Sequence, residues 1–402
     1  MTRTFITGAD LILPDGLASG RTVVIENERI ADIVDGPRAA SAGETRVDLP
    51  GHLLAPGFID VHVHGVSGID SLDGDGAVLA MAERLPRWGV TAFCPTSMAC
   101  APGVLDGFLY EVTRLCGKTA HHRARVLPAH LESNFINPDF RGAQPLGALR
   151  TLGPNPASDL HPHEFSGRDI LAVIDRRRAD VAIVTLAPEI DGGMELVRAL
   201  AASGIHVSIG HSGASYDRAR AAIVAGAHQA THLFNGMGPL GQRDPGMVGA
   251  ILTSHDVTAE LICDGHHVHP AVMRLAIAAK GTSRLMAMTD GTAGSGLPPG
   301  SRAQLGGQPI TVGDVARLDT GRIAGSVLTM DRAFAYLVRQ VKINLVQAAE
   351  MCAATPARAL GLNDLGHITS GALADLVALT GDLDVARTWV GGVTVWEPGT
   401  PA

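Results

Sequence analysis

The stretch GFIDVHVHG, residues 57–65, joins a short apolar strand to two histidines at its end, His62 and His64. Side chains alternate along a strand, so these two histidines share one face. A His-x-His pair has little weight by itself in a chain of 402 residues with 17 histidines, and similar pairs occur at residues 161–163 and 267–269. The surrounding sequence therefore has to show whether the first pair belongs to a metal site.

Seven more apolar, strand-like runs follow, most of them separated by stretches of helical period such as AVLAMAERLPRWG and YDRARAAIVAGA. Short, nearly continuous apolar strands are typical of a parallel sheet that is buried on both faces. Eight strands alternating with helices predict a (β/α)8 barrel, an α/β fold of the TIM type. The seven further runs are TAFCPTS (91–97), RVLPAHLES (125–133), AIVTLAPE (182–189), HVSIGHS (206–212), QATHLFN (229–235), TAELICDG (258–265) and LMAMTDG (285–291).

Both ends of the chain differ from this alternating middle. The first 50 residues and the last 35 consist of short β-like segments between turn formers such as PDG and DGP. We predict that the termini pair into one small β-sandwich domain, residues 1–55 and 366–402, beside a barrel of residues 56–365. A glycine-rich insertion, TAGSGLPPGSRAQLGG, follows the eighth strand and precedes the last predicted helix.

Composition indicates a compact globular protein. The chain is 46% hydrophobic with 48 glycines, and its net charge of −8 argues against nucleic acid or an anionic membrane as the main partner. Five cysteines without a C-x-x-C pair favour a reducing compartment. The sequence contains neither a recognisable signal peptide nor an uninterrupted apolar run of membrane-spanning length, so we expect a cytoplasmic protein.

Polar residues stand at the ends of the predicted strands, where barrels of this type keep their chemistry. Four imidazoles and two carboxylates meeting there predict a site for one or two divalent ions, Zn²⁺ or Fe²⁺. These residues are His62 and His64 on the first strand, Glu132 on the third, His211 on the fifth, His232 on the sixth and Asp290 on the eighth.

Each of these residues also has an ordinary structural interpretation. Glu132 could cap a helix or pair with an arginine, and Asp290 in TDG is a common turn residue. Six polar groups at the ends of buried strands are costly without a shared purpose, which favours the metal site. Of the other pairs, 161–163 lies in a proline-rich loop and is expected to be solvated, whereas His267 and His269 follow the seventh strand and could face the barrel mouth.

Taken together, the motifs resemble the amidohydrolase superfamily and, within it, the N-acetylglucosamine-6-phosphate deacetylase family. APGFIDVHVHG, HLE, GHS, ATHLFN, RDPG, ICDGHHV, MTD, GS-LTM and ATPARALGL occur in the family's order over nearly the whole chain. The resemblance implies that Glu132, His211 and His232 bind the principal metal. It allows a second ion at His62 and His64 that shares Glu132. No lysine ends the fourth strand, so the carbamylated lysine of hydantoinase-like relatives is not expected.

The resemblance also implies roles for residues outside the metal set. Asp290 matches the family's catalytic aspartate. Asn235, Arg243 and His267 match substrate-binding residues, the last two near a sugar phosphate. The implied activity is metal-dependent hydrolysis of the acetamide of an N-acetyl amino sugar 6-phosphate, first of all N-acetylglucosamine 6-phosphate, which gives acetate and the amino sugar 6-phosphate.

The chain departs from the family pattern around the expected acyl and sugar pocket. It has Ser133 and Asn134 in HLESNF where the family usually has HLEGPF, and Gln144 after Ala143 where the family usually has histidine. Gly236 replaces a usual alanine. We expect Ala143, Gln144 and Gly236 to contact substrate.

Other functions remain compatible with the sequence. They are deacylation of N-acetylgalactosamine 6-phosphate or another N-acyl amino sugar, a D-aminoacylase- or dihydropyrimidinase-like reaction, and a catalytically silent sugar-phosphate-binding barrel. Arg243 and His267 favour a phosphorylated sugar, and the filled catalytic positions favour an enzyme. The resemblance implies a homodimer, with no nucleic acid or membrane partner.

Overall fold

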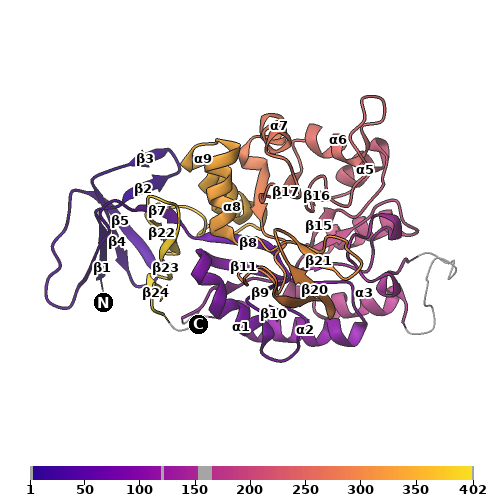
Figure 1. The fold of residues 1–402 in the computed structure, drawn as a ribbon, viewed down its shortest axis with the longest axis horizontal. Helices are drawn as coiled ribbons and strands as arrows, with labels where there is room; N and C mark the ends of the chain where they lie inside the picture. Colours follow the sequence, from indigo (N-terminus) through magenta and orange to yellow (C-terminus); the bar gives the residue numbers. More distant parts are fainter. Residues whose placement is uncertain (1–2, 119–121, 153–164, 401–402) are drawn as a thin grey trace.

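The computed structural model describes residues 3–118, 122–152 and 165–400 of the chain. The histidine pair at 161–163 lies outside these residues, so its expected solvation stays a prediction. The described chain forms a large barrel with a smaller β domain at one end, and both termini lie in or beside that smaller domain (Figure 1). Among the described residues, no helix is long and apolar enough to cross a membrane.

Eight parallel strands of the described chain form the barrel, and all eight predicted strands are confirmed. The ring closes where the residues after the last strand meet the first: Val63 bridges Gly291, and the Asp290 N–H donates to the His62 carbonyl at 2.9 Å. The hydrogen-bonded order is β8 (Phe58–Val63), β11 (Val90–Ser97), β13 (Ala129–Glu132), β14 (Val181–Leu186), β15 (His206–Ile209), β16 (Ala227–Ala230), β17 (Thr258–Ile262) and β18 (Leu285–Met288).

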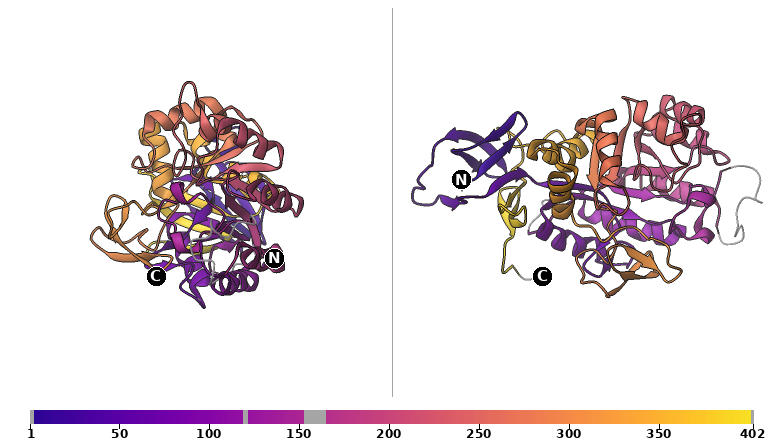
Figure 2. Two further views of the ribbon diagram at one scale, coloured as in Figure 1. Left: turned by 90° about the vertical axis from the view of Figure 1, so that its right-hand side faces the viewer. Right: turned by 45° about the horizontal axis from the view of Figure 1, so that its top comes forward.

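A helix follows each barrel strand, and these helices surround the barrel (Figures 1 and 2). Helix α3 shows why they form: Ser166 and Asp169 make a capping box, and Ile170, Val173 and Ile174 bury one face. The helices are α1 (Ala77–Arg84), α2 (Pro102–Leu115), α3 (Gly167–Arg176), α4 (Gly193–Ala202), α5 (Tyr216–Val224), α6 (Gly246–Thr253), α7 (Pro270–Lys280) and α8 (Met330–Tyr336), with α9 (Leu345–Ala349) and α10 (Thr355–Ala359) after them.

Strand β8 divides its side chains between two environments. Ile59, Val61 and Val63 belong to the large apolar cluster that joins the sheet to the helices. Asp60 and His62 alternate with them and are fully buried. The apolar face fixes the strand against the helices, and the polar face is thereby directed into the barrel.

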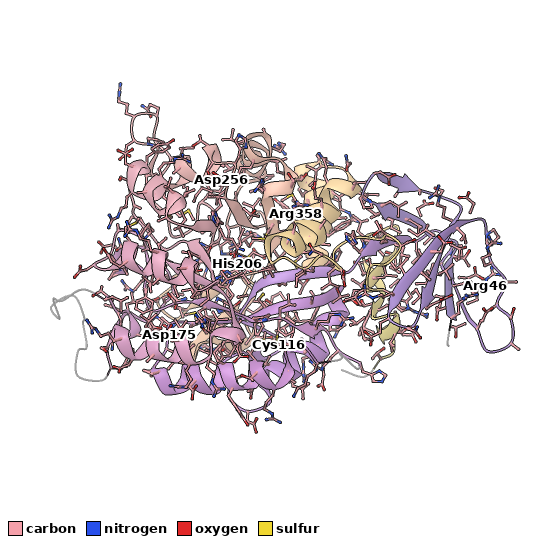
Figure 3. The ribbon with its side chains drawn as sticks, turned by 180° about the vertical axis from the view of Figure 1, so that it is seen from behind. Arg46, Cys116, Asp175, His206, Asp256 and Arg358 are labelled. Atoms are coloured by element: carbon pink, nitrogen blue, oxygen red, sulfur yellow. The ribbon has the colours of Figure 1, made fainter. Side chains whose placement is uncertain are left out.

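The small domain consists of two packed sheets from opposite ends of the chain, as predicted. Strand β22 pairs antiparallel with β7, and Trp389 packs in a core shared by both sheets. The exact bounds of the domain stay a prediction. The sheet orders are β5-β4-β1-β6 and β24-β23-β22-β7-β2-β3, with β1 (Arg3–Thr7), β2 (Asp10–Leu13), β3 (Gly16–Ala18), β4 (Arg21–Glu26), β5 (Arg29–Asp35), β6 (Thr45–Asp48), β7 (Leu53–Pro56), β22 (Leu376–Leu379), β23 (Val385–Val390) and β24 (Val393–Trp396). In Figure 3, Arg46 stands on this domain, whereas Asp175 and Asp256 lie on the barrel part.

The glycine-rich insertion after β18 and the residues that follow it form a three-stranded antiparallel sheet that the sequence did not predict. Its strands are β19 (Arg302–Leu305), β20 (Gln308–Val312) and β21 (Ala316–Leu318). Gly306 and Gly307, with φ of +55° and +79°, make the two-residue turn that joins β19 to β20. Leu305 packs against Met98, so the sheet lies beside the carboxyl-terminal end of β11.

Candidate metal centre and active site

Three of the predicted metal ligands meet at the carboxyl-terminal ends of β13, β15 and β16. Oε1 of Glu132 lies 2.8 Å from Nε2 of His211 and 3.0 Å from Nε2 of His232. The two Nε2 atoms are 3.0 Å apart. All three side chains are buried. The structure thus brings together the residues expected to hold the principal ion.

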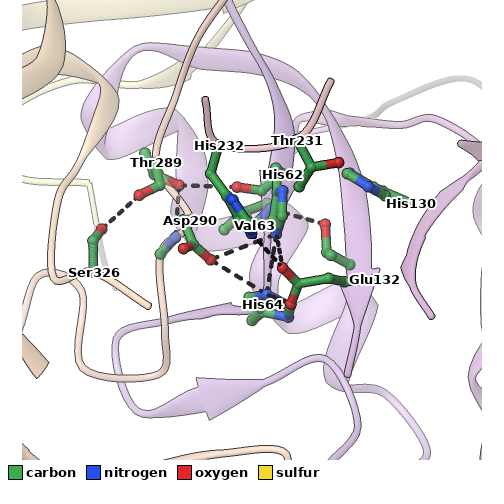
Figure 4. A network of polar contacts seen from close by, with 12 residues as sticks. His62, Val63, His64, His130, Glu132, Thr231, His232, Thr289, Asp290 and Ser326 are labelled. Carbon is green, nitrogen blue, oxygen red and sulfur yellow. Dashed lines mark hydrogen bonds and ion pairs between the residues drawn. The ribbon is translucent and has the colours of Figure 1, made fainter. Parts of the chain in front are cut away.

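His62, His64 and Asp290 form a second group of donors around Glu132 (Figure 4). Nε2 of His62 and Nε2 of His64 are 3.2 Å apart, and His64 Nε2 is 3.3 Å from Oε2 of Glu132. Oδ1 of Asp290 lies 3.5 Å from His62 Nε2 and 3.4 Å from His64 Nε2. Glu132 therefore faces both groups, with Oε1 toward His211 and His232 and Oε2 toward His64, and Asp290 lies beside His62 and His64.

Three of these residues have unusual backbone conformations. His211, His232 and Asp290 have φ of +46°, +31° and +49°, in the left-handed region that non-glycine residues rarely adopt. Each comes within two residues of the end of its strand. Such conformations persist only where the surrounding structure imposes them, and they cluster at functional sites. Here the turn after each strand directs its side chain toward the common centre.

Hydrogen bonds fix the orientation of two of the imidazoles. Nδ1–H of His211 donates to the Phe140 carbonyl at 2.7 Å, and Nδ1–H of His62 donates to Oε2 of Glu260 at 3.0 Å. Both rings therefore keep the Nε2 lone pair for the centre, as metal-binding histidines require. Neither Phe140 nor Glu260 was predicted from the sequence.

Polar side chains also fill the barrel below the site, where barrels usually hold aliphatic residues. His130 Nε2 lies 2.7 Å from Thr185 Oγ1, which is 2.6 Å from Thr231 Oγ1. Burial raises the pKa of both Asp60 and Glu260 to about 7. A usable signal was present in the sequence, because an acidic residue within an apolar strand run is costly unless it has partners.

The charges of the site favour a bound cation. Burial lowers the pKa of His62 to about 4. Burial also acts to lower the pKa of His64 and His232, but the neighbouring carboxylates Asp290 and Glu132 outweigh it and raise these values to about 10 and about 9. The raised pKa values mean that His64 and His232 hold protons in the places that a bound metal ion would take. Imidazole and carboxylate donors suit a divalent ion such as Zn²⁺ or Fe²⁺, so the residues present fit a metal.

Loading metal-free protein with Zn²⁺ near neutral pH should release protons, because His64 and His232 hold protons there and only neutral imidazole binds metal. The apparent affinity for Zn²⁺ should therefore rise with pH and level off once the pH reaches the pKa values of His232 and His64, about 9 and about 10. Calorimetry in two buffers of different ionisation enthalpy counts the protons released. Metal uptake without proton release would contradict this account of the site.

The site opens into a pocket of about 240 Å³. Of the predicted substrate residues, Ala143, Gln144, Asn235, Gly236 and His267 line it. The lining also includes His266, Met98, Leu305, Ile323 and Gly325, which the sequence did not identify.

Two expected contacts lie elsewhere. Arg243 is exposed on the loop between β16 and α6 and does not line the pocket. Its predicted place near a phosphate therefore stays a prediction. His269 begins α7, where its ring accepts a hydrogen bond from the Ala271 N–H at 3.2 Å. That histidine has a structural role as a helix cap.

The departures from the family pattern differ in their consequences. Ser133 Oγ donates to the Thr185 carbonyl at 2.5 Å, and Asn134 Nδ2 donates to the Cys100 and Ala148 carbonyls at 2.9 and 2.7 Å. Neither Ser133 nor Asn134 lines the pocket. Both residues hold the loop after β13 in place.

Gln144 and Gly236, by contrast, contact the centre itself. Oε1 of Gln144 accepts the Ala99 N–H at 2.8 Å, so its amide nitrogen faces and donates to Oε2 of Glu132. Gly236 has φ of +58°, and a Cβ there would lie 2.9 Å from Nδ1 of His211. Glycine thus avoids crowding this imidazole.

A (β/α)8 barrel with strand-end histidines and carboxylates converging at its mouth defines the class of metal-dependent hydrolases. The model of the Amidohydrolase family matches residues 53–395. The chain belongs to this family and, within it, to the N-acetylglucosamine-6-phosphate deacetylases.

Two curated relatives and one solved structure illustrate the similarity. N-acetylglucosamine-6-phosphate deacetylase of Rattus norvegicus is 38% identical, covering 87% of this chain and 85% of the relative. N-acetylgalactosamine-6-phosphate deacetylase of Escherichia coli O157:H7 is 34% identical over 85% of this chain and 87% of the relative. A Mycobacterium smegmatis N-acetyl-D-glucosamine-6-phosphate deacetylase variant, solved in complex with N-acetyl-D-glucosamine-6-phosphate, has a TM-score of 0.86, is 30% identical and covers 98% of this chain and all of that one.

Proposed function

We propose that this protein hydrolyses the acetamide of N-acetylglucosamine 6-phosphate and releases acetate and glucosamine 6-phosphate. The observation that carries the proposal is the meeting of Glu132, His211 and His232 in the same pocket as Asp290. Two of the three relatives described above bear the name of this activity. A catalytically silent barrel would have no need of both a complete donor set and a neighbouring acid–base group.

Glu132, His211 and His232 would hold the principal ion, Zn²⁺ or Fe²⁺, and His62 and His64 would hold a second. When bound, a divalent ion supplies Lewis acidity toward the acyl oxygen and lowers the pKa of water near it. The amide of Gln144 borders the same space and can donate a hydrogen bond toward the developing negative charge on that oxygen.

Asp290 moves the proton in this mechanism. Burial acts to raise its pKa, but the hydrogen bond from His64 and the charge of His62 outweigh it and keep the pKa below the usual value. The carboxylate is therefore ionised at neutral pH and can take a proton from the attacking water. Returning that proton to the amide nitrogen lets the amine leave as the C–N bond breaks.

The 34% identical N-acetylgalactosamine-6-phosphate deacetylase supports the galacto epimer as a second candidate substrate. A panel of N-acetyl amino sugars of both configurations, each with and without the 6-phosphate, tests both proposals on metal-reconstituted protein. Release of free amine from N-acetylglucosamine 6-phosphate with the highest kcat/KM is the expected result. A higher value for the galacto sugar would favour the second candidate, and no release from any member would refute both.

His62 and His64 should bind a second ion more weakly than the first. Both rings contact Asp290 and each other, but they share Glu132 with the principal group. We therefore expect titration with Zn²⁺ to show two steps, of which His64→Ala removes the weaker. If the wild type and His64→Ala both showed one binding step of the same affinity, His62 and His64 would instead contact substrate or have a structural role.

We also propose that the protein acts in the cytoplasm as a homodimer. All five cysteines are unpaired, which suits a reducing compartment. Val224, Leu240 and Leu275, on and between neighbouring helices α5, α6 and α7, expose 82%, 47% and 54% of their surface. Such apolar exposure favours a contact with a second copy. Sedimentation of the wild type against Leu240→Asp and Leu275→Asp tests this surface.

A further inference from the structure

Asp264 follows β17 closely and binds the two histidines that come after it. Its Oδ1 accepts the backbone N–H groups of His266 and His267, both at 2.9 Å. Its Oδ2 accepts Nδ1–H of His267 at 2.6 Å. The side chains of His267 and Asp264 are only 7% and 8% exposed, so this contact is largely shielded from water.

This carboxylate determines which nitrogen of His267 is left for the pocket. Because Nδ1 is bound to Asp264, Nε2 is the remaining polar atom of a ring that lines the pocket. A buried carboxylate at this distance also favours the doubly protonated imidazolium. Burial acts to lower the pKa of His267, but the hydrogen bond and charge of Asp264 outweigh it and raise the value above that of an ordinary histidine.

Other charged and titratable groups face the pair from neighbouring elements. Asp290, after β18, favours the protonated ring, and His232, after β16, opposes it. Tyr336 of α8 lies against Gly265 and is influenced by the charge of Asp264 and by Arg274 of α7. Asp264 is the only one of these groups that is hydrogen-bonded to the ring of His267 among the described residues.

We propose that Asp264 is a positioning residue that fixes the ring of His267 and keeps it cationic, so that Nε2–H anchors an anionic group in the pocket. The anion is a phosphate monoester, which rests on the proposed function. Asp264 acts through His267, since its own oxygens are occupied by the two backbone N–H groups and by the ring. A singly charged histidine donor makes a stronger hydrogen bond to an anion than a neutral one.

A purely structural role would use only part of this arrangement. The two bonds from Oδ1 to backbone N–H groups form an ordinary aspartate turn, and asparagine can make the same bonds. The bond from Oδ2 to the ring adds nothing to the turn. Asp264→Asn therefore preserves the loop and removes the charge beside the ring, which separates the two roles.

The experiment compares Asp264→Asn, His267→Gln, the double variant and Asp382→Asn. Asp382 is an exposed carboxylate on the turn between β22 and β23, so its variant makes the same charge change away from the pocket. The substrates are N-acetylglucosamine, its 6-phosphate and its 6-sulfate. The sulfate stays singly charged across the pH range, so any pH dependence of its KM belongs to the protein.

We expect Asp264→Asn to raise KM about tenfold or more for the phosphate and the sulfate, the size of a lost charged hydrogen bond, with kcat within a fewfold. KM for the unsubstituted sugar should hardly change. The double variant should match His267→Gln, because Asp264 acts through that ring. Asp382→Asn should behave as wild type. Equal KM increases for all three sugars, or additive effects in the double variant, would overturn the proposal.

NMR of ¹⁵N-histidine-labelled protein gives a second measurement that does not need substrate turnover. The His267 resonance, assigned by its loss in His267→Gln, should titrate above about 6.5, the ordinary histidine value, and should move down in Asp264→Asn. An unshifted titration in the wild type would overturn the proposal. If the protein deacetylates none of the sugars, the proposed function fails, while the NMR result still decides whether Asp264 controls the ring.

Discussion

Asp290→Asn should lower kcat by about a hundredfold or more, the usual size of a lost general acid–base group, while the protein keeps its principal metal. The reason is positional. Oδ1 of Asp290 lies beside His62 and His64, whereas Glu132, His211 and His232 meet without it. Asparagine retains the size of the side chain but cannot take a proton from water and return it to the amine.

Three measurements check this expectation. Elemental analysis should find the principal ion, substrate should still bind, and the acidic limb of the rate–pH profile should vanish in the variant. Asp256→Asn, which changes an exposed carboxylate before β17, is the matched control and should turn over normally. Deacetylation by Asp290→Asn within a fewfold of wild type would mean that another group moves the proton.

The barrel could be predicted because its eight strands are buried on both faces and therefore appear as apolar runs. The alternation of such runs with amphipathic helices leaves few other folds. The sheet β19–β21 was missed for the opposite reason. Its strands are partly exposed, and the glycines that suggested an irregular insertion form the tight turn at Gly306 and Gly307.

The convergence of the site could also be predicted, because parallel strands of a barrel end at one mouth. What the sequence could not give is the contact made by each side chain. His267 and His269 occupy similar positions in the chain, yet one lines the pocket and the other caps α7. Likewise, Ser133 and Asn134 depart from the family pattern beside Glu132 but bind backbone carbonyls away from the pocket.

The supporting carboxylates were missed because the sequence shows only that an acidic residue lies within an apolar strand run, and not which partners it meets. Glu260 contacts His62 and also accepts the backbone N–H of His232 at 3.3 Å, across 198 and 28 residues of sequence. Asp60 accepts the hydroxyl and N–H of Thr289, the residue before Asp290, at 2.5 and 3.2 Å. Only the closed barrel brings these groups together.

The largest loss should come from Glu132→Gln, which we expect to remove most of the bound metal and to lower activity about a thousandfold or more. An ion that contributes several kcal/mol to the reaction is lost with its ligand. Glu132 is the residue shared by both donor groups, with Oε1 toward His211 and His232 and Oε2 toward His64. Removing its charge leaves the imidazoles without the anion between them.

Metal occupancy and thermal unfolding together separate loss of the ion from loss of the fold. Wild-type protein should gain stability when Zn²⁺ is added, because an ion that binds only the folded state stabilises it. Glu132→Gln should fold but show little of this gain, and His211→Ala should behave in the same way. Glu195→Gln, an exposed substitution on α4, is the matched control and should retain both metal and stability. Full metal occupancy in Glu132→Gln and His211→Ala would refute the site, because other residues would then have to hold the ion.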